Sequence, residues 1–444
     1  MRLYTYLLEK IILPLGSIIS GNSFSTYLSY LRRCDNMSAF ELEAVQKEKL
    51  DKLLKYVLTD CEYYKSYGIK EKEDPYLTIK EFPILTKNLL RENESRLLTR
   101  PVSKLIRCSS SGSSGLRTSI YLTKKELGIP QATQLHWWNW AGYHSGEKLL
   151  QTGITPSRGF VKKIKDICFY TIYVPAFSLT EQQVVEILKS VKRGNYTLAG
   201  YASSLYVFAC AAREQKIHVT FKRALSWGDK LFEHYRKEIR DVFNCEVYDT
   251  YGCSEGMLMA AQKDLPYMYI MTPNVYIEIV DDEGNEVPDG TMGHVLVTNL
   301  NGYAMPLIRY KLGDLAVKLP LEKYPDKRKL NYPLLERVIG RDTDLVKTKS
   351  GKIMIVHTFT GIFEFYRSIK QFRVIQTEME GIDIEYIPSE TFADAELMKI
   401  ANDIYERTGE SRDSFYINFK RVDYIPPTSS GKPQIIKSLL GNKL

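Results

Sequence analysis

Ile425-Pro426-Pro427-Thr428-Ser429-Ser430-Gly431-Lys432 places one lysine on a polar, glycine-containing turn near the end of this 444-residue chain. A lysine in such a turn is usually a solvated surface residue. Here, however, three other polar loops precede it: residues 109–115, residues 251–255, and Gly313-Asp314 followed by Gly340-Arg341. The lysine is therefore interpreted together with these loops.

The first loop, Ser109-Ser110-Ser111-Gly112-Ser113-Ser114-Gly115, is crowded with hydroxyl groups and glycine. Backbone N–H groups and hydroxyls in such a loop can surround phosphate oxygens. It is not a Walker loop, because the glycine-lysine-threonine ending is absent at the required spacing. Taken alone, the segment fits an ordinary flexible loop equally well.

The second loop, Tyr251-Gly252-Cys253-Ser254-Glu255, follows a predicted strand. A tyrosine at such a turn can lie flat against a purine, Ser254 can donate to an α-phosphate, and Glu255 offers a hard oxygen ligand to Mg²⁺. Without companions, the same residues fit a strand-end turn with a solvated glutamate.

The third loop ends the segment Pro306-Leu307-Ile308-Arg309-Tyr310-Lys311-Leu312-Gly313-Asp314. A carboxylate held directly after a glycine can accept both hydrogen bonds from a ribose diol, so Asp314 suits a nucleotide site. Gly340-Arg341-Asp342-Thr343-Asp344 follows and completes the set.

In this order the loops resemble those of the adenylate-forming (acyl-AMP ligase) superfamily, and within it the branch of phenylacetate-CoA ligase and the CapK capsule-biosynthesis proteins. The resemblance spans roughly residues 80–437. The chain departs from the family pattern at Leu116 and Arg117, where the family usually continues Gly-Lys-Pro, and at Gly228-Asp229, where it more often has Gly-Glu.

The resemblance implies that ATP, Mg²⁺ and coenzyme A are used, and it assigns roles to individual residues. Lys432 and Glu255 are implied to be catalytic, and Glu255 is also implied to hold Mg²⁺. The implied ATP- or AMP-binding residues are Ser110, Ser111, Gly112, Ser113, Ser114, Gly115, Tyr251, Gly252, Ser254, Asp314 and Arg341.

The implied reaction is adenylation of a carboxylic acid with release of pyrophosphate, followed by acyl transfer to coenzyme A. Negative charge develops on the phosphoryl oxygens and on the leaving pyrophosphate, so a mobile ammonium at Lys432 would stabilise the transition state. Two alternatives stay open: acyl transfer to an amine or hydroxyl of a surface-polysaccharide precursor, and a nucleotide-binding subunit without catalysis. The second would not need Lys432.

Strand-like and helical segments alternate between residues 149 and 249, which predicts an α/β fold with a mainly parallel sheet. Strands predicted at 274–281 and 294–299 flank a turn, which indicates a small antiparallel, barrel-like subdomain. After Arg341 the pattern predicts a small α+β domain. We therefore expect a large AMP-binding domain at residues 1–340, with the subdomain at about 268–339, and a small mobile lid at residues 341–444.

Composition narrows the class of protein. With 44% hydrophobic and 26% charged residues the chain is typical of a globular protein. The net charge of +8 suits anionic small molecules or an anionic membrane surface, and no nucleic-acid module accompanies it. The seven cysteines lack paired or metal-ligand spacing, so we expect reduced thiols in a cytoplasmic protein and no structural zinc.

The N-terminal residues 1–14 are apolar but carry Glu9 and Lys10, and Pro14 predicts a break. Such a segment is too short and too charged to span a bilayer. A helix docked on the domain is the favoured interpretation, and peripheral membrane association through residues 1–20 at the inner face of the membrane is the alternative.

Overall fold

The computed structural model describes most of the chain. The described residues are 3–109, 119–153, 165–176, 179–191, 195–341, 345–363, 365–366, 368–427 and 434–440. The polar loop from Ser110 to Gly115, residues 342–344 and Lys432 lie outside the described residues.

The central sheet has eleven strands in the order β10-β11-β12-β13-β9-β8-β7-β6-β5-β3-β4. Five of them are parallel, as the alternation of elements predicts. These are β3 (Lys148–Gly153), β4 (Thr171–Pro175), β5 (Tyr196–Tyr201), β6 (Ala224–Trp227) and β7 (Val247–Gly252).

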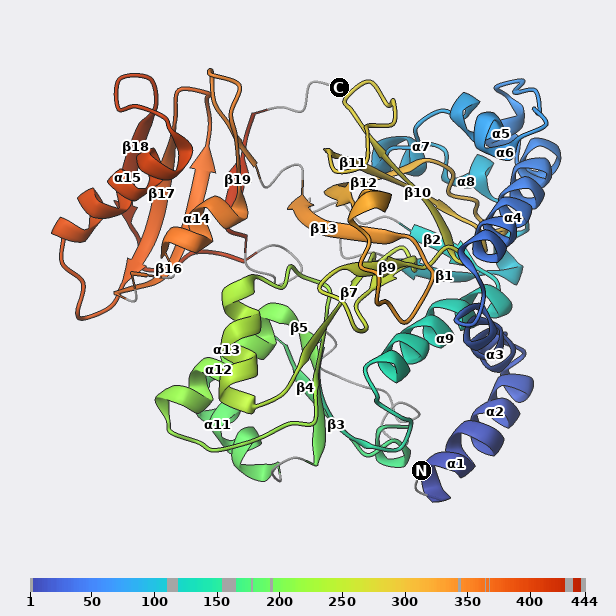
Figure 1. The fold of residues 1–444 in the computed structure, drawn as a ribbon, viewed down its shortest axis with the longest axis horizontal. Helices are drawn as coiled ribbons and strands as arrows, with labels where there is room; N and C mark the ends of the chain where they lie inside the picture. Colours follow the sequence, from blue (N-terminus) through green and yellow to red (C-terminus); the bar gives the residue numbers. More distant parts are fainter. Residues whose placement is uncertain are drawn as a thin grey trace.

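Both faces of the parallel part are covered, because successive side chains of a strand point to opposite faces. On one face Leu150 and Leu198 pack with α11 (Glu181–Ser190), α12 (Ala202–Glu214) and α13 (Glu233–Phe243) (Figure 1). On the other face their neighbours Leu149 and Ala199 pack with α3 (Phe24–Cys34) and α9 (Lys124–Trp140). The hydrophobic runs in these strands reflect this two-sided burial.

Beyond β7 the sheet continues with antiparallel strands. They are β8 (Leu258–Ala261), β9 (Met268–Ile270), β10 (Val275–Val280), β11 (Met292–Asn299), β12 (Tyr310–Lys318) and β13 (Leu334–Arg341). The change to antiparallel pairing that the sequence predicts is therefore confirmed. A separate antiparallel pair joins β1 (Ile106–Ser109) and β2 (Ser119–Leu122).

The C-terminal part is a small α+β unit, as predicted. Its four-stranded sheet has the order β18-β17-β16-β19. Its elements are β14 (Leu345–Lys347), β15 (Ile353–Ile355), α14 (Val356–Phe363), β16 (Ile369–Gln376), β17 (Gly381–Pro388), α15 (Ala395–Thr408), β18 (Tyr416–Arg421) and β19 (Ile436–Ser438). Phe232, at the start of α13, packs into the core of this unit. The domain boundary at residue 341 stays a prediction.

Short helices cover the antiparallel part of the sheet around one long helix. The long helix α4 (Ala39–Asp60) begins with a capping box of Ser38 and Glu41. The short ones are α5 (Glu62–Lys65), α6 (Pro75–Thr78), η2 (Ile79–Glu81), α7 (Lys87–Glu92), α8 (Glu94–Leu97), η3 (Val102–Lys104) and η4 (Leu321–Lys323).

The predicted break at Pro14 is wrong. The helix runs without interruption through α1 (Leu3–Leu7), the π-helical turn η1 (Leu8–Ile12) and α2 (Leu13–Ser20). Pro14 is the second residue of α2 and directly follows the π-helical turn, where the regular α-helical hydrogen-bond pattern is already interrupted. The segment Leu3–Ser20 is consequently long and apolar enough, by length and composition, to cross a membrane, which also corrects the expectation that it is too short.

Candidate active site

The second polar loop lies where the parallel part of the sheet meets the antiparallel part. Tyr251 and Gly252 end β7, and the chain turns at once into β8. The N–H group of Cys253 donates to the carbonyl of Met257 at 2.9 Å, which closes the turn. A Cβ at Gly252 would lie 3.0 Å from that carbonyl oxygen, so the tight turn favours glycine there.

Tyr251, Asp314 and Arg341 form one contact group. The Tyr251 hydroxyl donates to Oδ2 of Asp314 at 2.9 Å, and Nε of Arg341 lies 3.1 Å from Oδ1 of the same carboxylate. Asp314 and Arg341 are paired residues on β12 and β13. Burial and the adjacent Asp314 carboxylate raise the pKa of Tyr251 well above its ordinary value, so its hydroxyl stays a donor.

Glu255 forms a second group beside the first. Its side chain is buried and accepts hydrogen bonds from the hydroxyls of Tyr310 at 3.0 Å and Ser254 at 3.1 Å. Burial and the Glu255 carboxylate raise the pKa of Tyr310, so this hydroxyl also remains protonated. The sequence does not reveal Tyr310 as a site residue, although it belongs to the segment that ends at Asp314.

The residues present fit a magnesium ion that arrives with a nucleotide. Among the described residues no group of three His, Cys, Asp or Glu side chains could hold a metal by itself. Mg²⁺ commonly uses one or two protein carboxylates together with phosphate oxygens and water. Glu255 supplies one carboxylate whose two oxygens each retain further acceptor capacity.

Arg309, the residue before Tyr310, is bonded to three other segments of the chain. Its guanidinium bonds the Glu278 carboxylate, with Nε 3.1 Å from Oε1, and donates to the carbonyl oxygens of Phe82 and Gly284 at 3.2 and 2.9 Å. Its backbone has a φ of 47°, a left-handed conformation that non-glycine residues rarely adopt. These bonds fix the chain immediately before Tyr310.

Two family models match this chain. One is described as AMP-binding enzyme and matches residues 171–303, and the other is described as CapK C-terminal domain and matches residues 345–439. Protein CapK of Staphylococcus aureus is 23% identical over 417 residues, which cover 90% of this chain and 89% of that protein. Phenylacetate-coenzyme A ligase of Escherichia coli (strain K12) is 24% identical over 346 residues, which cover 70% of this chain and 74% of that protein.

This chain belongs to the adenylate-forming superfamily. Within it, the chain falls in the branch of CapK and the phenylacetate-CoA ligases. The predicted family is therefore confirmed, and the chain is an AMP-forming acid ligase by class.

Solved structures of acyl-CoA ligases have a fold similar to that of this chain. 2-Hydroxyisobutyryl-CoA ligase in the postadenylation state gives a TM-score of 0.73 at 16% identity, covering 92% of this chain and 91% of that one. The same ligase in the thioesterification state gives 0.58 at 17% identity, covering 92% and 91%. The predicted fold class is confirmed by this likeness.

Two of the expected contributions to an adenylate-forming site lie outside the described residues. The loop from Ser110 to Gly115 is bounded by β1 and β2, whose pairing brings Ser109 opposite Ser119. Lys432 precedes β19, which pairs in parallel with β16. Their roles stay predictions.

Other sequence features have structural roles. Asp229 caps the N-terminus of α12, because its Oδ2 accepts from the backbone N–H of Ser203 at 3.2 Å. The aromatic segment at residues 136–140 is part of the core: Asp35 lies 3.1 Å from Nε2 of His136 and accepts from Nε1 of Trp140 at 2.9 Å.

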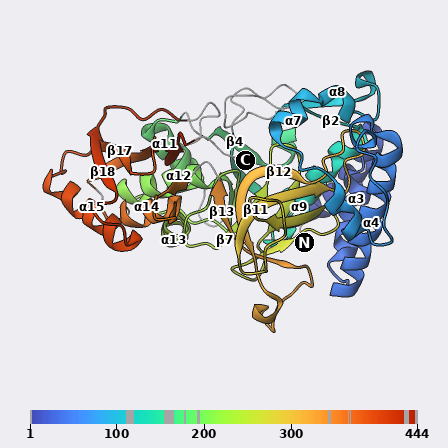
Figure 2. The same cartoon turned by 90° about the horizontal axis from the view of Figure 1, so that it is seen from above.

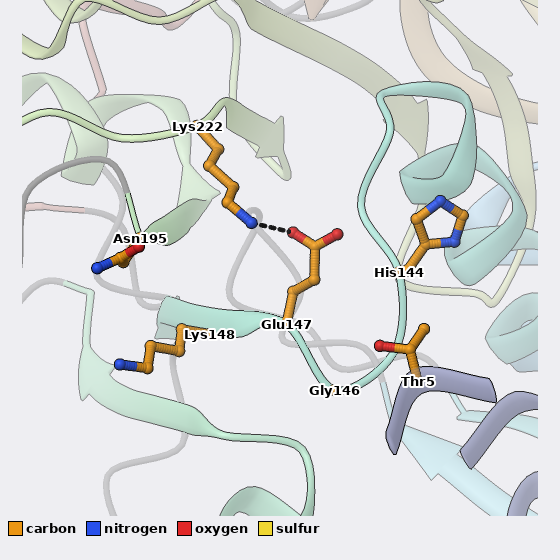
Figure 3. A pocket seen from close by; sticks show the side chains of 7 residues that line it. All are labelled: Thr5, His144, Gly146, Glu147, Lys148, Asn195 and Lys222. Carbon is orange, nitrogen blue, oxygen red and sulfur yellow. Dashed lines mark hydrogen bonds and ion pairs between the residues drawn. The ribbon is translucent and has the colours of Figure 1, made fainter. Parts of the chain in front are cut away.

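A polar cavity of about 360 Å³, drawn in Figure 3, is lined by none of these site residues. Lys148 is the first residue of β3, while Asn195 and Lys222 shortly precede β5 and β6, so the cavity lies at the amino ends of parallel strands. Ligands of open α/β sheets bind outside the carboxyl ends. Tyr251 lies near the carboxyl end of β7, so we place the candidate active site there and not in this cavity.

Proposed function

We propose that this enzyme uses ATP to convert a carboxylic acid to an acyl-adenylate, with release of pyrophosphate, and then transfers the acyl group to coenzyme A. The observation that carries the proposal is the contact of Tyr251, Asp314 and Arg341, with Glu255 alongside. These residues come from separate loops of the chain, and each matches a motif position of the family. Phenylacetate-CoA ligases among the relatives support coenzyme A as the acceptor.

In this proposal Asp314 binds the ribose diol of ATP. Both of its oxygens already accept a bond, from Tyr251 and Arg341, but a carboxylate offers about four acceptor sites, so two remain for the diol. The Arg341 side chain is 39% exposed and can shift toward a phosphate when the nucleotide enters. Tyr251 and Gly252 line the adenine end of the site.

Ser254 and Glu255 serve the phosphate end. The Ser254 hydroxyl now donates to Glu255 and can turn to an α-phosphate oxygen instead. When Mg²⁺ is bound, it neutralises phosphate charge, and Glu255 is the carboxylate that would hold it. The hydroxyl-rich loop from Ser110 to Gly115 and the ammonium of Lys432 would complete the cradle of donors around the triphosphate.

A different acceptor is the second candidate function. CapK matches 90% of this chain, more than the 70% matched by the Escherichia coli phenylacetate-CoA ligase, and the C-terminal model is named for CapK. This observation favours acyl transfer to an amine or hydroxyl of a surface-polysaccharide precursor as the alternative to coenzyme A. We propose a cytoplasmic location for either reaction, where ATP and coenzyme A are available.

Exchange of labelled pyrophosphate into ATP, measured across aryl, fatty, hydroxy and amino acids, tests the first half-reaction without knowledge of the acceptor. We expect acid-dependent, Mg²⁺-dependent exchange with at least one class of acid. Addition of coenzyme A to the active combination then tests the second half-reaction. Adenylate that accumulates unchanged with coenzyme A, but is consumed by an amino sugar, would select the alternative acceptor. No exchange with any acid would contradict adenylation itself.

A further inference from the structure

The N-terminal helix presents an apolar stripe to solvent. Leu3, Leu7, Ile11, Leu15 and Ile18 follow one another at intervals of three or four residues, and all five are exposed. Ile18 and Ile19 are 75% and 86% exposed. A helix of a globular protein normally turns such a stripe toward the core.

The opposite side of this helix is its attached side, and it is partly polar. Thr5, Leu8 and Ser17 are buried against the protein. The Glu9 side chain is also turned inward, only 5% exposed, where it meets Arg32 at 3.3 Å and accepts from the N–H group of Ser145 at 3.2 Å. The polarity of the helix is thus inverted relative to that of a helix adapted to water.

The apolar surface extends beyond the helix to residues 165–170. Ile167 and Tyr170 are 75% and 52% exposed. Tyr170 packs on Tyr4 with ring centroids 5.3 Å apart, and the Tyr4 hydroxyl donates to the carbonyl of Cys168 at 2.6 Å. Two segments far apart in the sequence therefore build one surface, which we call the N-terminal apolar surface: residues 3–19 together with Ile167 and Tyr170. Contiguous apolar surfaces of this kind mark interaction sites.

Basic side chains surround this surface. Lys10 is exposed on the helix, Lys165 is exposed beside Ile167, and Lys125 is exposed at the other end, where its carbonyl accepts from the Ser23 hydroxyl at 2.6 Å. The one carboxylate of the helix, Glu9, is bonded inside the protein. Asp166, of intermediate exposure beside Lys165, adds one carboxylate, so three lysines and one aspartate border the surface and the net charge is positive.

The polar cavity adjoins the first turns of the same helix (Figure 3). Thr5 lines it, and a Cβ at Gly146 would lie 2.7 Å from Cδ1 of Leu8. Lys222 bonds the Glu147 carboxylate at 3.0 Å, whereas Lys148 packs its ammonium over the Tyr196 ring at 5.5 Å and pairs with no carboxylate among the described residues. Lys148 therefore adds a positive charge to the cavity that adjoins the helix.

We propose that the N-terminal apolar surface docks on an anionic lipid bilayer, with the helix Leu3–Ser20 lying in the plane of the membrane surface. Apolar side chains would enter the boundary of the acyl chains, tyrosine hydroxyls would stay at the headgroups, and the lysines would attract anionic lipid. The helix does not span the bilayer in this arrangement, because Glu9 and Thr5 hold one side of it against the protein.

A second copy of this chain is the less favourable occupant. A two-fold contact brings the same patch of both subunits together, so the lysines that border the surface of one copy would approach those of the other. Glu9 is buried, and the single carboxylate Asp166 offsets only part of the charge of these lysines. An anionic bilayer can bury the apolar stripe among its acyl chains and attract the bordering lysines with its headgroups.

The N-terminal apolar surface lies far from the C-terminal unit. Both views place the N-terminal helices toward one end of the long axis and the C-terminal sheet, with β16, β17 and β18, at the other (Figures 1 and 2). A membrane-bound enzyme would thus keep the C-terminal unit in the aqueous phase.

Flotation of the full-length protein with vesicles tests the proposal. We expect binding to vesicles of phosphatidylcholine with 30 mol% phosphatidylglycerol that is about tenfold stronger than binding to phosphatidylcholine alone, and that weakens at high salt. In the double variant Ile18→Glu, Ile19→Glu the binding should fall by about tenfold or more. Phe40→Glu is the matched control, because Phe40 is 80% exposed on α4 outside the surface, and it should bind like the wild type.

Two accompanying sets of measurements control for loss of fold and for self-association. Pyrophosphate exchange and the unfolding transition of the double variant should match those of the wild type, which shows that its fold is retained. Sedimentation velocity should give a monomer at the concentrations used for flotation. Absence of binding to either vesicle, equal loss in the Phe40→Glu control, or a dimer that dissociates in the double variant would overturn the proposal.

Discussion

Two ion pairs at the start of β12 lie close together in sequence but differ in exposure. The side chains of Arg309 and Glu278 are 9% and 1% exposed, whereas those of Asp314 and Arg341 are 14% and 39% exposed. Arg309 also donates to main-chain carbonyls, so its donors are used within the protein. The difference teaches that burial separates a pair that maintains the fold from a pair that can exchange partners with a ligand.

Removal of Arg309 should cause the largest loss of stability. Arg309→Ala leaves the buried Glu278 carboxylate without its partner, and such a loss costs about 3–5 kcal/mol. Burial already raises the pKa of Glu278, and Arg309 opposes that shift, so the variant carboxyl should take up a proton. Chemical denaturation of wild type and variant measures the effect.

Arg337→Ala is the control, since Arg337 is 63% exposed and pairs with Glu336 on the surface. It should change the free energy of unfolding by less than about 1 kcal/mol. Equal destabilisation by both substitutions would remove the contrast between buried and exposed pairs. If Arg309→Ala does not fold at all, Arg309→Lys, which keeps the charge but loses the fork of donors, should give an intermediate stability.

Loss of Lys432 should affect catalysis and not stability. Lys432→Ala is expected to slow adenylate formation by about 10²–10³-fold, because one preorganised contact to developing charge contributes about 3–4 kcal/mol. Acyl transfer from a supplied acyl-adenylate should remain. Single-turnover assays of both steps measure this, with Lys437→Ala, an exposed lysine on β19, as the matched control. Adenylation at the wild-type rate in Lys432→Ala would refute the assigned role.

Asp249 tests how a carboxyl group of intermediate exposure changes stability with pH. It lies on β7 two residues before Tyr251, and the surrounding protein raises its pKa to about 7 by displacing water, although Arg236 opposes this. Because the folded state holds the proton more tightly than the unfolded chain, stability should fall as pH rises from about 4 through about 7. Partial exposure limits the effect to roughly 1–2 kcal/mol, below the roughly 4 kcal/mol of the full shift.

Asp249→Asn cannot titrate, so it should lose less stability than the wild type over this range. The measurement is the difference in unfolding free energy between the two proteins at pH 4, 6 and 8. A difference that does not change with pH would show that Asp249 titrates near its ordinary value.

Tyr251→Phe should have the smallest effect. The substitution removes the hydroxyl that bonds Asp314 but leaves the ring, and the net loss should be about 1 kcal/mol of stability. In the proposed site it also frees one acceptor position of Asp314, so ATP affinity should change by less than about fivefold. Calorimetric titration with ATP and thermal unfolding check both values, and a loss of ATP binding would assign the hydroxyl a direct contact with the nucleotide.

The sequence predicts the ordered motifs but not their contacts. Tyr251, Asp314 and Arg341 are identified by their loops, yet only the pairing of β12 with β13 and the contact of β12 with the end of β7 bring them together. Tyr310 is missed because a tyrosine in an apolar segment gives no signal of its contact with Glu255.

The N-terminal helix illustrates a second limit of prediction from the sequence. Local rules predict that Pro14 ends the helix, but the π-helical turn before it lets the helix continue to Ser20. The buried bonds of Glu9 to Arg32 and Ser145 stabilise that course, and they join residues distant in the sequence. The capping boxes of α4 and α11, in contrast, join only neighbouring residues, so the sequence pattern alone can predict such features.

The most direct test of the nucleotide site is the affinity of ATP for the Asp314→Ala variant. Calorimetric titration in the presence of Mg²⁺ should show binding that is about tenfold weaker or more, because a carboxylate bonded to a diol contributes about 1.5–3 kcal/mol. Asp326→Ala, which removes an exposed carboxylate, should bind ATP like the wild type. Unchanged ATP affinity in a folded Asp314→Ala variant would contradict the proposed site.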